Sequence, residues 1–63
     1  MKMIFDEIRK RKGITKMFIA KELGVSRGTI DNWIEGKSII RLDQAIKLTK
    51  ILNCKLEDLY EEE

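Results

Sequence analysis

The sequence predicts an all-α fold in which five short helices pack around one core. With 63 residues the chain can form only one domain, over residues 1–63. A chain this short buries only about 60% of its unfolded surface and cannot be divided into two cores. Apolar residues recur at helical spacing between glycine breaks, and no segment shows the period-two alternation that is typical of a strand. Hydrophobic residues make up 43% of the chain, which is enough for one core. We therefore expect a compact helical domain without strands.

The first helix is expected over residues 2–12. Ile4, Phe5 and Ile8 fall at helical spacing among charged residues in this segment. Gly13 follows, and glycine readily takes the left-handed conformation that ends many helices. The first break in the chain is therefore predicted at Gly13.

Two capping residues predict the second and third helices. Thr15 can cap a helix that ends at Gly24, and Ser26 can cap a helix over residues 27–35 that ends at Gly36. The apolar residues expected to face inward from these helices are Ile19, Ala20, Leu23, Ile30, Trp33 and Ile34. The helical phase of Trp33 matches that of Ile30, so we interpret its indole as part of the core.

The fourth and fifth helices are expected in the second half of the chain. Residues 42–52 repeat a helical pattern and are followed by Asn53, the best residue after glycine for a left-handed helix end. The positions that make this pattern are Leu42, Ala45, Ile46, Thr49 and Leu52. A short last helix is expected around Leu56, Leu59 and Tyr60, followed by an acidic tail over residues 61–63.

Composition argues against several classes of function. No apolar stretch approaches the ~18–20 residues that a membrane span requires. The single cysteine, Cys54, cannot close an internal disulfide, and no secretion signal is recognisable, so we expect a cytoplasmic protein. Histidine is absent and the carboxylates are dispersed. We therefore expect no metal, no cofactor, no small-molecule ligand and no enzymatic activity.

The charge is unevenly distributed along the chain. Residues 1–37 carry nine Lys or Arg against five Asp or Glu, whereas residues 38–63 carry four against six. Such a basic half is compatible with phosphate binding, although a solvated surface explains it equally well.

Residues 15–36 have the layout of a helix-turn-helix motif. A helix, a short turn of Gly24, Val25 and Ser26, and a second helix follow one another without interruption. In proteins that bind DNA, this layout sets the first helix across the backbone and the second in the major groove. The motif therefore points to double-stranded DNA.

These residues resemble the Cro and repressor family of helix-turn-helix domains. The resemblance rests on Gly-Ile-Thr at 13–15, on the run Ile-Ala-Lys-Glu-Leu-Gly-Val-Ser-Arg at 19–27, and on Ile30, Trp33 and Gly-Lys at 36–37. It continues through residues 42–59 and so covers nearly the whole chain. It implies a repressor-like, five-helix DNA-binding domain that reads a palindromic operator as a homodimer and regulates transcription, usually by repression.

The resemblance also implies which residues contact DNA. The positions that face the groove are Arg27, Gly28, Thr29 and Asn32. There, Arg27 can bind guanine, Asn32 can bind adenine, and Thr29 can contact thymine or a phosphate. The positions that hold the phosphate backbone are Thr15, Lys16, Lys37, Ser38 and Arg41. The pairing surface of the homodimer is expected at Ile51, Leu56, Leu59 and Tyr60.

Three positions depart from the family pattern. Gly28 offers no side chain where members usually present one, which means either a close approach of its backbone to DNA or the loss of one contact. Ile34 replaces a glutamate that usually pairs with the arginine matching Arg9, so Arg9 is free for a nearby acid or a phosphate. Arg41 stands where a capping Ser or Thr is frequent, so the fourth helix is expected to begin without a good cap.

Four further apolar residues lie at positions that are usually polar or in a loop: Met17, Phe18, Ile39 and Ile40. They either fill the core or form a surface for a partner. The second interpretation gives an alternative function, in which the same fold serves as a protein-interaction module such as an antitoxin or antirepressor-like subunit.

Overall fold

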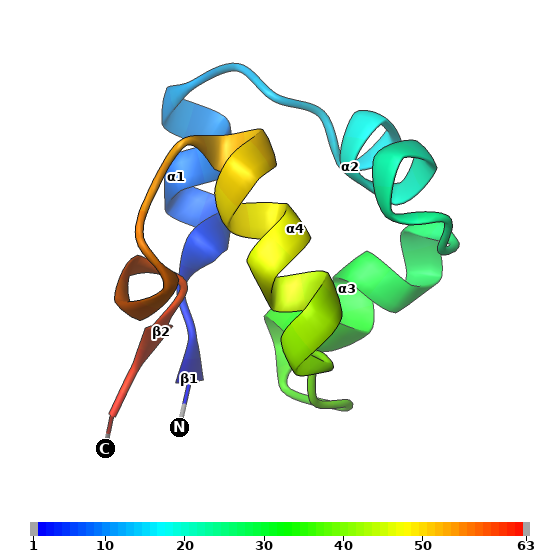
Figure 1. The fold of residues 1–63 in the computed structure, drawn as a ribbon. Coiled ribbons are helices and arrows are strands. Elements are labelled where there is room, and N and C mark those ends of the chain that lie inside the picture. The colour runs from blue at the N-terminus through cyan, green and yellow to red at the C-terminus, as the bar shows by residue number, and fades with distance from the viewer. Residues whose placement is uncertain (1, 63) are drawn as a thin grey trace.

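A computed structural model describes residues 2–62, so Met1 and Glu63, the last residue of the predicted acidic tail, lie outside the described range. The elements in chain order are β1 (Lys2–Met3), α1 (Phe5–Arg11), α2 (Lys16–Leu23), α3 (Arg27–Glu35), α4 (Leu42–Leu52), the 3₁₀ turn η1 (Leu56–Asp58) and β2 (Tyr60–Glu61). Figure 1 shows α2 on the side of the molecule away from β1 and β2, with α3 running from the α2 side back toward β1. No helix within residues 2–62 is long and apolar enough to cross a membrane.

The predicted caps set the boundaries of α2 and α3. The Thr15 hydroxyl accepts a hydrogen bond from the Phe18 backbone N–H at 3.0 Å, and the Ser26 hydroxyl accepts one from the Thr29 N–H at 3.2 Å. These bonds satisfy N–H groups that the first turn of a helix leaves without a partner. α2 then ends at Gly24, whose φ of 70° lies in the left-handed region. The predicted starts of both helices and the glycine end of α2 are confirmed.

The prediction of five helices and no strand is wrong at the two ends of the chain. The segment expected to form a fifth helix is a single 3₁₀ turn followed by β2, and the first two residues of the expected first helix form β1. β1 and β2 pair antiparallel, with Lys2 opposite Glu61 and Met3 opposite Tyr60. Strands of two residues are too short to show an alternating pattern, so the sequence gives no signal for their pairing.

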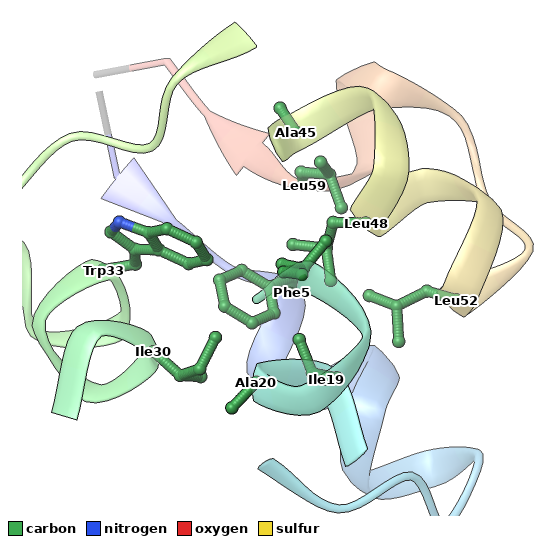
Figure 2. Packing of buried hydrophobic residues seen from close by; sticks show 10 residues of the cluster. Phe5, Ile19, Ala20, Ile30, Trp33, Ala45, Leu48, Leu52 and Leu59 are labelled. Carbon is green, nitrogen blue, oxygen red and sulfur yellow. The ribbon is translucent and has the colours of Figure 1, made fainter. Parts of the chain in front are cut away.

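The core lies between the four helices and η1. Figure 2 shows the Phe5 ring in the middle of the buried cluster, with Trp33 on one side and Leu52 on the other. Trp33 is 5% exposed and Ile30 is fully buried, which confirms the inward phase expected for α3. The remaining buried apolar residues are Ile19, Ala20, Leu23, Ala45, Leu48 and Leu59. The half-buried Cys54 packs against this cluster, and burial raises the pKa of its thiol.

The predicted apolar phase of α4 is wrong at two positions. α4 buries Ala45, Leu48 and Leu52, whereas Leu42 is 66% exposed and Ile46 is 44% exposed. The buried positions follow the i, i+3, i+7 spacing of one helix face, and the two exposed residues lie beside that face. They consequently add apolar area to the exposed surface of α4.

Long-range hydrogen bonds fix α4 against α1 and α2. The Lys12 ammonium donates to the carbonyl oxygens of Leu52 and Asn53, the latter at 3.2 Å. A cation near a helix C-terminus interacts favourably with its exposed carbonyls. The Gln44 amide donates to the Leu23 carbonyl at 3.2 Å. α4 is therefore tied to both of the helices that precede α3.

Gly28 is not required by the fold, so we expect Gly28→Ala to stabilise the protein. A Cβ at this position would meet only the Ser26 hydroxyl, at an ordinary contact distance of 3.7 Å. Alanine should therefore raise the free energy of unfolding by about 0.5–1 kcal/mol. Urea unfolding followed by circular dichroism measures this.

Gly24→Ala is the matched control for that change. Its φ of 70° strains any residue with a Cβ, so alanine there should lower the free energy of unfolding by about 1–2 kcal/mol. A loss of stability in Gly28→Ala as large as that in Gly24→Ala would contradict the expectation.

Candidate nucleic-acid interface

The turn between α2 and α3 fixes how α3 is presented. The Val25 N–H donates to the Ala20 carbonyl at 3.0 Å, and the Val25 side chain packs against the core. On the inner face of α3, Ile30 and Trp33 are buried in a cluster with residues of α1, α2 and α4. The opposite face of α3 is consequently left to solvent.

The four residues predicted to read bases lie on α3. Arg27, Gly28 and Asn32 are exposed, and Thr29 is half-buried. Within residues 2–62, the Arg27 guanidinium makes no salt bridge. The Thr29 hydroxyl lies 3.0 Å from the Ser26 hydroxyl, so it is already engaged at the helix cap. Of these four residues, Arg27 and Asn32 thus present the free polar groups on the exposed face of α3.

A shallow hollow lies where the starts of α2 and α3 meet α1. Arg9, Thr15, Lys16, Met17 and Arg27 line it. Three of the five lining residues are cations, and Thr15 caps α2 at the same place. Backbone N–H groups at a helix start also favour anions. The hollow is therefore lined mainly by groups that attract an anion.

Arg9 is held within the domain by two polar contacts. Its Nε donates to Asp6 Oδ1 at 2.7 Å, and its Nη1 donates to the Ile14 carbonyl at 2.9 Å. Burial alone would raise the pKa of the Asp6 carboxyl, but the hydrogen bonds and charges of Arg9 and Lys10 lower it. Of the two partners expected for Arg9, a nearby acid or a phosphate, the structure shows the acid, Asp6.

Lys16 is also paired, with a residue that the sequence analysis did not single out. Its ammonium lies 2.7 Å from Asp31 Oδ1 on α3. The hydrogen bond from Lys16 lowers the pKa of the Asp31 carboxyl, and the charges of Lys16 and Arg27 add to this effect. The two residues are 15 positions apart, so no local pattern indicated the pair. The one local signal is the spacing of Arg27 and Asp31, which are one helical turn apart and therefore share a face of α3.

The loop between α3 and α4 presents two more of the predicted cations. Lys37 pairs with Glu35 at 3.2 Å and Arg41 pairs with Asp43 at 3.4 Å, and all four side chains are more than half exposed. Such exposed pairs contribute little free energy, so both cations remain available to an anion. Ser38 is exposed beside them. Arg41 precedes α4 without a side-chain cap bond, as expected.

The residues predicted to pair two copies are not equally accessible. Leu56 is 41% exposed, Ile51 and Tyr60 are half-buried, and Leu59 lies in the core at 1% exposure. Leu42 shares a groove of ≈ 270 Å³ with Leu56, Leu59 and Tyr60. The exposed apolar surface around this groove therefore includes Leu42, which was not among the residues predicted to pair two copies.

Most of the four unexplained apolar residues lie outside the core. Met17 is 63% exposed, Phe18 is 50% exposed and Ile39 is 80% exposed. The core-filling interpretation is wrong for these three residues. Ile40 is half-buried and packs against the core cluster, in agreement with that interpretation.

Comparison with known proteins agrees with this geometry. A helix-turn-helix family model matches residues 6–59. Two relatives from Archaeoglobus fulgidus, each described as an uncharacterized HTH-type transcriptional regulator, are similar to this chain. One is 37% identical over 54 residues, which cover 86% of this chain and 77% of the relative. The other is 35% identical over 60 residues, which cover 95% of this chain and 84% of the relative.

The family match and both relatives cover much more of the chain than the helix-turn-helix motif alone. The matched region includes the capped helices α2 and α3, and with them Ile30 and Trp33, the buried residues of α3. The chain belongs to the Cro and repressor family of DNA-binding helix-turn-helix domains.

Proposed function

We propose that this protein binds a specific double-stranded DNA sequence and regulates transcription, with repression as the expected mode. The observation that carries the proposal is the two-sided nature of α3, which buries Ile30 and Trp33 and exposes Arg27 and Asn32. An α-helix with a long polar face fits the major groove of B-form DNA. α3 is therefore the element that reads the sequence.

The exposed side chains suggest which bases are read. The Arg27 guanidinium can donate two hydrogen bonds to O6 and N7 of guanine, and the Asn32 amide can bind N6 and N7 of adenine. Each such contact distinguishes the correct base pair by about 1–3 kcal/mol. The Thr29 hydroxyl is engaged by Ser26, which leaves its methyl group for a thymine methyl. Gly28 permits the backbone of α3 to approach the base edges closely.

Phosphate contacts are proposed on both sides of α3. Thr15 and Lys16 lie at the start of α2, and Lys37, Ser38 and Arg41 lie in the loop that follows α3. Contacts of this kind fix the position of the protein on the duplex without reading sequence. They would hold α3 at a constant depth in the groove.

We propose that two copies bind together at an inverted repeat. A single module of this size covers only about 600–1,000 Å² of protein surface in a DNA complex. A two-fold dimer sets two recognition helices about 34 Å apart, one turn of DNA. The apolar groove supports pairing around Leu56 and Tyr60, with Leu42 beside them. Ile51 does not line this groove and stays a proposed contact on the family resemblance alone. Leu59 contributes the floor of the groove rather than an exposed contact.

A protein-interaction module is the second candidate function. The observation that favours it is the exposure of Met17 and Phe18 on α2, because two neighbouring large apolar side chains in solvent are typical of a partner surface. Under either function, we propose that the protein acts in the cytoplasm, without a cofactor or a small-molecule ligand and without catalysis.

Selection of bound sequences from a random duplex pool tests the role of α3. At moderate salt, the wild-type protein should enrich a short inverted repeat that Arg27→Ala no longer enriches, because the guanine contacts are lost. Arg11→Ala is the matched control, since Arg11 is exposed and lines a hollow with Asn53 and Glu57 rather than with α3. It should enrich the wild-type sequence. A pool left unenriched by the wild-type protein would favour the second candidate.

Sedimentation of Leu56→Ser and Phe18→Ser tests the pairing surface. Leu56→Ser should shift the protein toward monomer and weaken binding to an inverted repeat at least tenfold, because polar atoms then face the groove. Phe18→Ser removes similar apolar area on α2 and should leave both properties unchanged. If Phe18→Ser alone abolishes self-association, pairing occurs through α2 and the proposed surface is incorrect. Circular dichroism confirms that each variant is folded.

A further inference from the structure

Asp31 is the acid of α3 that lies nearest to the proposed phosphate contacts. It follows Arg27 by one helical turn and precedes Asn32, and its carboxylate accepts a hydrogen bond from Lys16 at 2.7 Å. A carboxylate at this place opposes the approach of a phosphate, because like charges repel. The phosphate contacts alone therefore do not explain why α3 carries an acid beside Arg27 and Asn32.

The pair of Lys16 and Asp31 is shorter and more buried than the other ion pairs near the proposed DNA contacts in α3 and the following loop. The two side chains are 27% and 35% exposed. In contrast, the pair of Lys37 and Glu35 is 67% and 53% exposed at a distance of 3.2 Å. A less exposed pair is screened less by salt and by water, so it persists longer. Lys16 therefore spends more time on its acid than Lys37 does.

Unselected DNA and the correct site make different demands on Lys16. Binding to unselected DNA depends almost entirely on cations that neutralise phosphates. At the correct site, base contacts from Arg27 and Asn32 seat α3 in the groove and thereby fix a phosphate close to the start of α2. That phosphate can replace Asp31 as the partner of Lys16. On unselected DNA, α3 is not seated and nothing forces this exchange.

We propose that Asp31 determines specificity by withholding Lys16 from the phosphates of unselected DNA. Asp31 acts through Lys16 and touches no base, so it is a positioning residue. This inference rests on the proposed function, because it concerns the ratio between two modes of DNA binding. The same arrangement makes Lys16 a contact that is used fully only at the correct site.

Salt-dependent binding of Asp31→Asn to two duplexes tests the proposal. One duplex carries the sequence selected by the wild-type protein and the other is a scrambled version of equal length. On scrambled DNA, Asp31→Asn should steepen the slope of log K against log salt by about 0.9, the value for one added phosphate contact. Affinity for scrambled DNA should rise several-fold more than affinity for the selected site. The specificity ratio should therefore fall.

Two further variants separate this effect from a simple change of charge. Glu35→Gln removes the same charge from α3 but frees only the exposed Lys37, so its slope on scrambled DNA should change by less than half as much. In a Lys16→Met background, Asp31→Asn should have no effect on the slope, because the two residues then form no pair. Lys16→Met alone should weaken the selected site and leave scrambled DNA nearly unchanged.

Several outcomes would overturn the proposal. An unchanged slope in Asp31→Asn means that Lys16 is not withheld. A loss of affinity for the selected site that persists in the Lys16→Met background means that Asp31 contacts a base directly. If the salt slope of Lys16→Met on scrambled DNA is shallower than that of the wild-type protein by about 0.9, then Lys16 already binds a phosphate there. Failure of the wild-type protein to bind either duplex overturns the proposed function as well, whereas the other results leave it intact.

Discussion

The burial of one face of α3 is the interaction on which the rest of this structure depends. Ile30 and Trp33 of α3 pack into a cluster that has Phe5 of α1 at its middle. Contacts with this cluster therefore determine where α3 lies. With only ten buried apolar residues within the described chain, each contributes a large share of the stability. The reading face therefore has its orientation fixed by packing, and its exposed residues are free to vary without cost to the fold.

The parts of the fold that depend on neighbouring residues could be predicted from the sequence. Thr15 and Ser26 cap helices through bonds to residues three positions ahead, and Gly24 takes a conformation that its own chemistry permits. The pairing of β1 with β2 could not be predicted, because it joins segments almost 60 residues apart and each strand has two residues. For α4, the error arose because Leu42 and Ile46 are apolar yet lie beside the buried stripe.

The same distinction holds for the candidate site. The motif and the family resemblance indicated that α3 bears the reading residues, and α3 does expose Arg27 and Asn32. Neither source indicated that Lys16 would be paired, since its partner Asp31 comes from another helix. A list of cations along a sequence overstates the charge that a duplex encounters. Contacts between side chains decide how much of that charge is free.

The sheet of β1 and β2 has a consequence for how the domain can be joined to other polypeptides. Because Lys2 lies opposite Glu61, polypeptide that enters at β1 and polypeptide that leaves at β2 run side by side. A domain whose entry and exit strands are neighbours is well suited to insertion into another polypeptide. The domain could thus be spliced into an exposed loop of a host protein as a cassette joined through these two strands.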